Sequence, residues 1–362
     1  WPATAHTIKH SMLHAGRAMR NELGARVALG FDPPLALALP DGSLASEEFS
    51  YPEKRMKAYW KQFYLKNGKI LGSYILIACI FWMLVMIILP QVFMIDFSLR
   101  TNVPPPKWGT EVHTYTLEHY KYMVYGSAKA QQSYNVVDLS VFFRTIWAAI
   151  VVTMIDLALC YPVAYFIAHV AKGGWARLMA VSLIVPFWVN EILRAFAFKI
   201  MFGSSGVINN FLVWSGILSQ PYDFIRDNWA LWAGLSYAFI LLMIFPIYNA
   251  VETLDKNQIE AARDLGSPWW RIHWRVVIPH AKPGISSGCT MVFMLTAGTL
   301  AAPQILGGPS SLWFTQIIYQ AFIQAGNWAR GSAYALVLLI TCIIFVLFVM
   351  KVFKVKLGEI AR

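Results

Sequence analysis

Six long apolar runs separate the hydrophilic parts of this sequence, and they restrict the chain to one class of fold. A helix needs about 20 mostly apolar residues to cross the hydrocarbon core of a membrane, and each run is long enough. Backbone polar groups inside a bilayer must be hydrogen-bonded within the protein, which a helix achieves by itself. We therefore expect an all-α membrane protein with six transmembrane helices, at about 70–95, 141–168, 177–202, 229–251, 284–306 and 332–353.

The content and placement of charge support a membrane protein. Charged residues make up 14% of the 362 residues, whereas a soluble domain carries about 25%. The net charge of +11 would suit nucleic acid, but the basic residues are sorted between the two sides of the membrane. With the N-terminus inside, 21 Lys and Arg are cytoplasmic and 6 lie on the opposite side. Since basic residues are retained in the cytoplasm, we expect both termini there, membrane lipid around the chain, and no nucleic-acid partner.

Residues 1–69 contain no run long enough to span, and we expect them to form a cytoplasmic extension, separate from a six-span domain at 70–362. Lysines are interleaved with aromatic residues over 52–69. This stretch is either an amphipathic helix on the anionic face of the membrane or a flexible basic flank. The sequence leaves both interpretations open.

The connection 252–283 is hydrophilic, yet it carries the signals of ordered helices. Asp255 can cap a helix, and Gln258 three residues later completes a variant of the capping box. Gly266 lies where a helix ends in a left-handed residue. Ser267-Pro268 then supplies an N-cap and a proline at the first helical position. We expect two short helices joined at Gly266, outside the membrane, in a form suited to docking another protein.

The same connection resembles the EAA loop of ABC-importer permeases. The resemblance rests on Glu260-Ala261-Ala262, on Gly266 after three more residues, and on the tetrad Val276-Val277-Ile278-Pro279 after nine more. The family's tetrad has the form Ile-x-Leu-Pro, so Val and Ile here are conservative departures. Four stretches look like the permeases of the spermidine/putrescine group: 161–166, 186–210, 252–266 and 306–308.

This resemblance implies partners and a location in the bacterial inner membrane. Such permeases work with a second homologous permease, two cytoplasmic ABC ATPase subunits and a periplasmic solute-binding protein. The EAA loop would lie in a groove of the ATPase, where Glu260 makes polar contact and Gly266 allows the bend. The residues expected to couple the chain to the ATPase are Glu260, Ala261, Ala262, Arg263, Asp264, Gly266 and Pro279.

The sequence shows no catalytic motif. It contains no G-x-x-x-x-G-K-[ST] phosphate loop, no His-Glu-x-x-His and no Gly-x-Ser-x-Gly, and its four cysteines lack metal-ligand spacing. We therefore expect a non-catalytic transport subunit with no metal site and no cofactor of its own. ATP and Mg²⁺ would bind to the partner ATPase.

Import of a polyamine such as putrescine or spermidine is the function that the resemblance favours. Similar permeases carry an opine or amino-acid derivative, phosphonate, sulfate or ferric ion, so these solutes stay open. A secondary transporter driven by an ion gradient would need paired acids at mid-membrane and repeated broken helices. A membrane enzyme would need a catalytic cluster, and the histidines His113, His119 and His169 are scattered.

Ionisable residues within the apolar runs are costly and usually face a cavity or a partner. Trp188, Asn190 and Glu191 follow a proline and are candidates to line the solute path, where an acid and an aromatic ring suit a cationic solute. Asp156 is a second candidate for the path, or else a tie between helices. The alternative for Glu191 is a structural ion pair with Arg194, three residues later on the same helix face.

Overall fold

The computed structural model describes residues 68–103, 114–126, 134–171, 173–308 and 311–355, and these are almost entirely helical. Among these described residues, the β-type pairing is limited to one isolated antiparallel bridge between Arg100 and Tyr115. The chain divides into two units, 1–86 and 87–362. Apart from its last two residues, the predicted N-terminal extension 1–69 lies outside the described part of the chain.

The described part of the first unit is a single apolar helix. It consists of α3 (Lys69–Met83) and the beginning of the π-helical segment η1 (Leu84–Ile88). Its large apolar side chains are exposed around the helix, from Ile70 to Met86. A helix that is apolar on all sides is typical of a membrane span.

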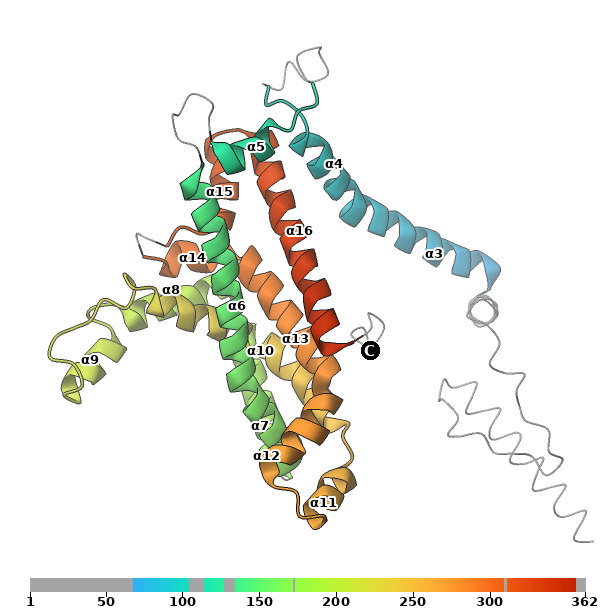
Figure 1. The fold of residues 1–362 in the computed structure, drawn as a ribbon, viewed down its shortest axis with the longest axis vertical. Coiled ribbons are helices and arrows are strands. Elements are labelled where there is room, and N and C mark those ends of the chain that lie inside the picture. The colour runs from blue at the N-terminus through green and yellow to red at the C-terminus, as the bar shows by residue number, and fades with distance from the viewer. Residues whose placement is uncertain (1–67, 104–113, 127–133, 172, 309–310, 356–362) are drawn as a thin grey trace, which may run out of the picture. The chain divides into compact units, whose positions relative to one another are not determined.

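The second unit contains helices that differ widely in length (Figure 1). They are α4 (Leu89–Ser98), α5 (Glu118–Tyr125), α6 (Val136–Tyr165), η3 (Phe166–Val170), α7 (Gly174–Ile184), η4 (Val185–Trp188), α8 (Glu191–Phe202), α9 (Val207–Trp214), α10 (Trp229–Glu252), α11 (Lys256–Asp264), α12 (Trp269–Ile272), η5 (His273–Val277), α13 (Ile278–Gly298), α14 (Ala301–Leu306), α15 (Phe314–Tyr319), η6 (Gln320–Gln324) and α16 (Trp328–Phe353).

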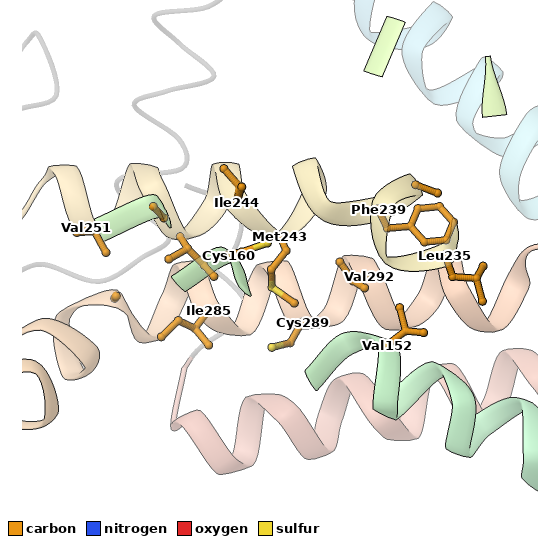
Figure 2. Close-up of a cluster of buried hydrophobic side chains, with 14 of the residues drawn as sticks. Val152, Cys160, Leu235, Phe239, Met243, Ile244, Val251, Ile285, Cys289 and Val292 are labelled. Carbon is orange, nitrogen blue, oxygen red and sulfur yellow. The ribbon is translucent and has the colours of Figure 1, made fainter. Parts of the chain in front are cut away.

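The core of the second unit lies between α6, α10 and α13. Helix α10 packs against both α6 and α13, and α13 also packs against α16. Figure 2 shows buried side chains that fill the space between α6, α10 and α13. They include Val152, Cys160, Leu235, Phe239, Met243, Ile244, Val251, Ile285, Cys289 and Val292.

Helices α10 and α13 approach each other at two glycines. A Cβ atom at Gly284 would overlap with the carbonyl oxygen of Pro246 and lie 2.6 Å from the methyl group of Ala250. A Cβ atom at Gly288 would lie 2.8 Å from the sulfur of Met243. The glycines are four residues apart, the spacing that lets membrane helices pack backbone against backbone. This contact holds together the two helices that lead into and out of the connection 252–283.

Within the described residues, five helical stretches are long and apolar enough to cross a membrane: Ile70–Ser98, Val136–Val170, Glu191–Trp214, Trp229–Glu252 and Trp328–Phe353. Four of them overlap the first, second, fourth and sixth predicted runs, and Glu191–Trp214 overlaps only the second half of the third run. The third and fifth predicted runs are each interrupted and do not form one continuous helix. The number of six membrane spans therefore stays a prediction.

The third predicted run, 177–202, is broken. Helix α7 passes into the 3₁₀ turn η4, because Pro186 has no N–H to continue the α-helical bonding. Helix α8 then begins afresh after Asn190. The fifth predicted run, 284–306, is interrupted as well: α13 ends at Gly298, and α14 restarts at Ala301.

We predict that Gly284→Ala destabilises the protein by about 1–3 kcal/mol, the usual cost of overpacking a tight contact. The added methyl group meets backbone at Pro246, which cannot rotate away as a side chain can. The control is Gly298→Ala in the same helix, where the new methyl group meets open space. The measurement is the midpoint of thermal unfolding in detergent, and equal midpoints for the two variants would contradict the prediction.

Candidate functional site

The connection 252–283 contains the two short helices α11 and α12, with a fixed bend between them. The carboxylate of Asp255 caps α11 by accepting a hydrogen bond from the backbone N–H of Asn257 at 3.0 Å. Gly266 has a φ of 75°, which confirms the left-handed residue expected there. The backbone N–H of Ser267 donates to the carbonyl of Ala262 at 3.1 Å, and that of Gly266 to the carbonyl of Arg263 at 2.9 Å. These two bonds form a Schellman motif, which satisfies the last carbonyl groups of α11.

The second helix starts differently from the prediction. Pro268 is itself the N-cap residue of α12, and no side chain caps this end, so Ser267 is not the cap. Nor is a capping box with Gln258 formed among the described residues: α11 is capped by the Asp255 carboxylate, which accepts from the backbone N–H of Asn257. Helix α12 runs directly into η5 and α13. The π-helical turn η5 precedes Pro279, whose missing N–H displaces the backbone bonding so that Ile278 donates to the carbonyl of His273.

Helix α11 has one buried face and one exposed face. Ile259 is buried in the main apolar cluster together with Leu254 just before the helix, and Ala262 packs against that cluster. Leu265 is 86% exposed and Trp269 is 74% exposed. We call the exposed surface the outer face of the loop: Glu260, Ala261, Arg263, Asp264, Leu265, Trp269, Trp270 and Trp274. Apolar side chains exposed among charged ones are typical of a surface that binds another molecule.

The predicted coupling residues lie mostly on or beside this outer face. Glu260, Ala261, Arg263 and Asp264 are exposed on α11, and Gly266 is exposed at the bend. Ala262 differs, since it is half-buried against the core. Pro279 is exposed in the first turn of α13.

Sequence reasoning missed the contact between the loop and α6. The hydroxyl oxygen of Tyr161 lies 2.8 Å from Nδ1 of His273 at the start of η5. The ring of Tyr165 packs edge-on against the same imidazole, with centroids 4.4 Å apart. Burial lowers the pKa of His273, so that its imidazole is neutral at neutral pH. One sequence feature could have indicated this contact: Tyr161 and Tyr165 are four residues apart, so both lie on one face of a helix.

The two helix breaks meet at Glu191. The Asn190 side chain accepts a hydrogen bond from the backbone N–H of Ile192 at 2.8 Å and so caps α8. Glu191 follows in the first turn, where a carboxylate is favoured by the helix dipole. Its Oε1 atom accepts a hydrogen bond from the hydroxyl of Thr299 at 3.0 Å. Thr299 lies in the break between α13 and α14, and its carbonyl accepts a bond from the Thr315 hydroxyl at 2.7 Å.

The ion pair between Glu191 and Arg194, which the sequence left open as an alternative, does not form among the described residues. The ion pairs among the described residues join Arg100 with Asp96 and Arg330 with Asp138. The guanidinium of Arg194 instead donates to the carbonyl of Ala238 at 3.3 Å. Helix α10 thus provides the partner for Arg194, and the break at Thr299 provides the partner for Glu191.

The four predicted path residues do not share one surface. Trp188 is 85% exposed and Asn190 is exposed, whereas Glu191 is half-buried. Asp156 is 0% exposed, in the core where α6 meets α10. Within the described residues, neither of its carboxylate oxygens has a hydrogen-bond partner of good geometry, and its polar neighbour is the Ser236 hydroxyl, also without one. No cluster of His, Cys, Asp and Glu in the described part of the chain could hold a metal ion.

Residues 125–354, which include every helix from α6 to α16, match the family model described as Binding-protein-dependent transport system inner membrane component. The chain belongs to this family. As a member of the binding-protein-dependent transport family, it is a multi-pass membrane permease. The connection 252–283 and both helix breaks lie within the matched residues.

Several curated proteins are similar to this chain over most of their length. The spermidine/putrescine transport system permease protein PotB of Salmonella typhimurium (strain SL1344) is 28% identical over 276 residues, which cover 76% of this chain and 91% of that protein. PotB of Escherichia coli (strain K12) is 29% identical over 259 residues, covering 72% and 89%. The molybdenum transport system permease protein ModB of Azotobacter vinelandii is 24% identical over 232 residues, covering 61% and 97%.

One solved structure has a fold similar to that of this chain. It is the crystal structure of a bacterial ABC transporter involved in the import of the acidic polysaccharide alginate. One of its chains matches 83% of this chain and 98% of its own length, with a TM-score of 0.59 and 15% identity. The likeness supports an ABC-permease fold for this chain.

We predict that Thr299→Val destabilises the protein by about 1–3 kcal/mol, because it leaves the half-buried Glu191 carboxylate without its hydroxyl donor. Thr299→Ser keeps the hydroxyl and is the matched control. The measurement is again the thermal unfolding midpoint in detergent. A Val variant as stable as the Ser variant would show that the bond between the two breaks contributes nothing.

Proposed function

We propose that this chain is the permease subunit of an ATP-driven importer that moves a polyamine, such as putrescine or spermidine, from a periplasmic binding protein into the cytoplasm. The observation that carries the proposal is the outer face of the loop. The apolar side of α11 is buried in the core of the permease, whereas its charged side is free to bind a partner. This arrangement suits an element that binds an ATPase and passes movement to the membrane helices.

The outer face is the proposed coupling surface. Glu260 makes polar contact in a groove of the ATPase, flanked by Arg263 and Asp264 on the same helix. The Schellman motif at Gly266 keeps α11 and α12 at one angle, so both helices move together. Exposed Leu265 lies next to this bend and supplies apolar contact area.

The proposed membrane arrangement follows from the excess of Lys and Arg on one side. Six spans place both termini and the loop 252–283 in the cytoplasm. The two broken runs, 177–202 and 284–306, then each cross the membrane as a discontinuous helix. The breaks need not be unfavourable in a bilayer, because irregular backbone is tolerated where it faces protein or a water-filled path.

The proposed partners are a second homologous permease, two cytoplasmic ABC ATPase subunits and a periplasmic solute-binding protein. ATP and Mg²⁺ bind to the ATPase subunits, and hydrolysis takes place there. This chain contributes no catalytic residue. The support for these partners is the family to which the chain belongs and the solved alginate transporter, which was also crystallised with its periplasmic protein bound.

Polyamine is the proposed solute because PotB relatives match the chain over more of its length, and at higher identity, than the molybdenum permease ModB does. The local chemistry agrees with a cationic solute. Trp188 presents an exposed ring and Glu191 a carboxylate, which together suit an ammonium group. We assign Trp188, Asn190 and Glu191 to the path. Buried Asp156 is assigned to the tie between α6 and α10.

For the coupling surface, we predict that Glu260→Arg prevents the ATPase from co-purifying with the permease, because it reverses the charge on the outer face. The variant permease should still insert and elute as a single species in detergent. Gln258→Arg is the matched control, since it adds the same side chain to an exposed position on the other flank of buried Ile259. Co-purification of the ATPase with both variants would mean that α11 is only a connection.

For the path, we predict that Glu191→Gln weakens uptake of putrescine by about tenfold or more, the effect of losing about 1.4 kcal/mol of attraction for an ammonium group. Asp156→Asn should transport at the wild-type rate, because Asp156 has no exposed surface. The measurement is uptake of labelled putrescine into liposomes that contain the complete transporter and its binding protein. Wild-type affinity in Glu191→Gln would remove this residue from the path.

A further inference from the structure

Three aromatic rings surround His273 where the loop joins the membrane helices. Tyr161 and Tyr165 come from the last turns of α6, and Trp269 comes from α12. The centroid of the Trp269 ring lies 5.5 Å from that of the imidazole, and the Tyr165 centroid lies 4.4 Å from it. The hydroxyl of Tyr161 completes the group with its bond to Nδ1. We call these four residues the His273 cluster.

The end of α6 and the segment η3 that continues it are bonded next to both ends of the loop. Tyr161 contacts the loop where it leads into α13, at His273. One turn beyond Tyr165, the Nε2 atom of His169 lies 3.0 Å from the carbonyl oxygen of Val251, where α10 leads into the loop. The rings of Tyr165 and His169 are themselves in contact, with centroids 5.4 Å apart. Displacement of the loop therefore acts on α6 through Tyr161 and on η3 through His169.

Both sides of this contact involve π-helical backbone. Segment η3 follows Tyr165 directly, and its bond from the N–H of Ala171 to the carbonyl of Phe166 measures 2.8 Å. Segment η5 begins at His273. Single π-helical turns within α-helices are rare, and they are frequently found at functional sites. Here two of them adjoin the contact between the loop and α6.

We propose that the His273 cluster transmits movement of the loop to α6. This inference rests on the function proposed above. Apolar packing alone allows helices to slide, whereas a hydrogen bond of 2.8 Å and an edge-on ring contact favour one relative position. Movement of α12 carries His273 with it, and Tyr161 must then follow or lose its bond. Tyr161 and His273 act as positioning residues that touch neither ATP nor solute.

Two variants that each remove one tyrosine hydroxyl test whether the hydrogen bond, and not only ring packing, transmits movement of the loop to α6. Tyr161→Phe removes the bond to His273 and keeps the ring. Tyr165→Phe, one turn later on the same helix face, removes a hydroxyl that bonds to none of the described residues and is the matched control. Both variants keep the apolar contacts of α6, so neither is expected to unfold the protein.

The experiment uses the complete transporter in liposomes, with both permeases, the ATPase subunits, the binding protein and putrescine as the probe. ATP hydrolysis and uptake are measured on the same sample. We expect Tyr161→Phe to lower uptake per ATP hydrolysed by about two- to tenfold, as the loss of one neutral hydrogen bond would in an equilibrium. ATPase binding and hydrolysis should stay at wild-type levels, and Tyr165→Phe should match wild type in every respect.

A double variant tests whether the two partners act through one bond. Tyr161→Phe combined with His273→Ala should be no worse than His273→Ala alone, because the bond is already lost. His273→Asn keeps a polar atom near the position of Nδ1 and should recover part of the coupling. Additive losses in the double variant, wild-type coupling in Tyr161→Phe, or an equal defect in Tyr165→Phe would each overturn the proposal.

Failure of the function proposed above would be seen in the wild-type protein first. If no ATPase associates with it, that function is wrong and the variants need not be made. If an ATPase binds but putrescine is not taken up, amide hydrogen exchange over 166–171 tests the cluster without a solute. Trapping ATP should change this exchange in wild type and in Tyr165→Phe, but not in Tyr161→Phe. The same response in all three would overturn the proposal.

Discussion

The close contact between α10 and α13 determines the position of the loop that joins them. At Gly284 the backbone of α13 lies against the carbonyl of Pro246, so the two helices have a fixed spacing where they enter the loop. A bond between the Thr253 hydroxyl and Nε2 of His280, at 3.1 Å, closes the base of the loop below that contact. With its base held in this way, α11 can bury Ile259 only by turning its charged side outward.

The irregular parts of the chain follow from the need to satisfy polar groups in an apolar environment. A proline within a helix leaves a carbonyl without its donor, and the chain responds with a π-helical turn before Pro279 and with a break after Pro186. In the proposed membrane arrangement, each break exposes backbone groups that lipid cannot bond. Glu191 lies at one break and Thr299 at the other. The hydrogen bond from the Thr299 hydroxyl to the Glu191 carboxylate gives both side chains a partner inside the protein.

Much of the fold could be predicted from the sequence, because apolar periodicity and helix-end signals are local. The apolar run 229–251 became α10 almost residue for residue, and Gly266 adopts the left-handed backbone that its place after α11 indicated. The breaks were harder to predict. The run 284–306 remains apolar through Thr299, so composition alone did not show that α13 ends at Gly298.

The side-chain partners at the candidate site could not be predicted in the same way, because they come from distant segments. Arg194 is three residues from Glu191 on the same helix, and the local rule for such a pair allowed a salt bridge as one alternative. The actual partner of Glu191 is Thr299, 108 residues away, and that of Tyr161 is His273, 112 residues away. A single sequence carries no record of such pairs. The packing of α6 against α10 and α13 brings together Tyr161 and His273, and the packing of α8 against α14 brings together Glu191 and Thr299.

Helices α12, η5 and α13 form one unbroken helix from Trp269 to Gly298, and this continuity has a mechanical consequence. At a rise of about 1.5 Å per residue its 30 residues extend for about 45 Å, longer than the hydrocarbon core is thick. One end carries exposed Trp269 on the loop, and the other stops next to Thr299 and its bond to Glu191. A tilt of about 5° pivoting at the loop would shift the far end of such a rod by about 4 Å, more than the length of a hydrogen bond. A small change of angle in the loop is therefore sufficient to separate the two helix breaks.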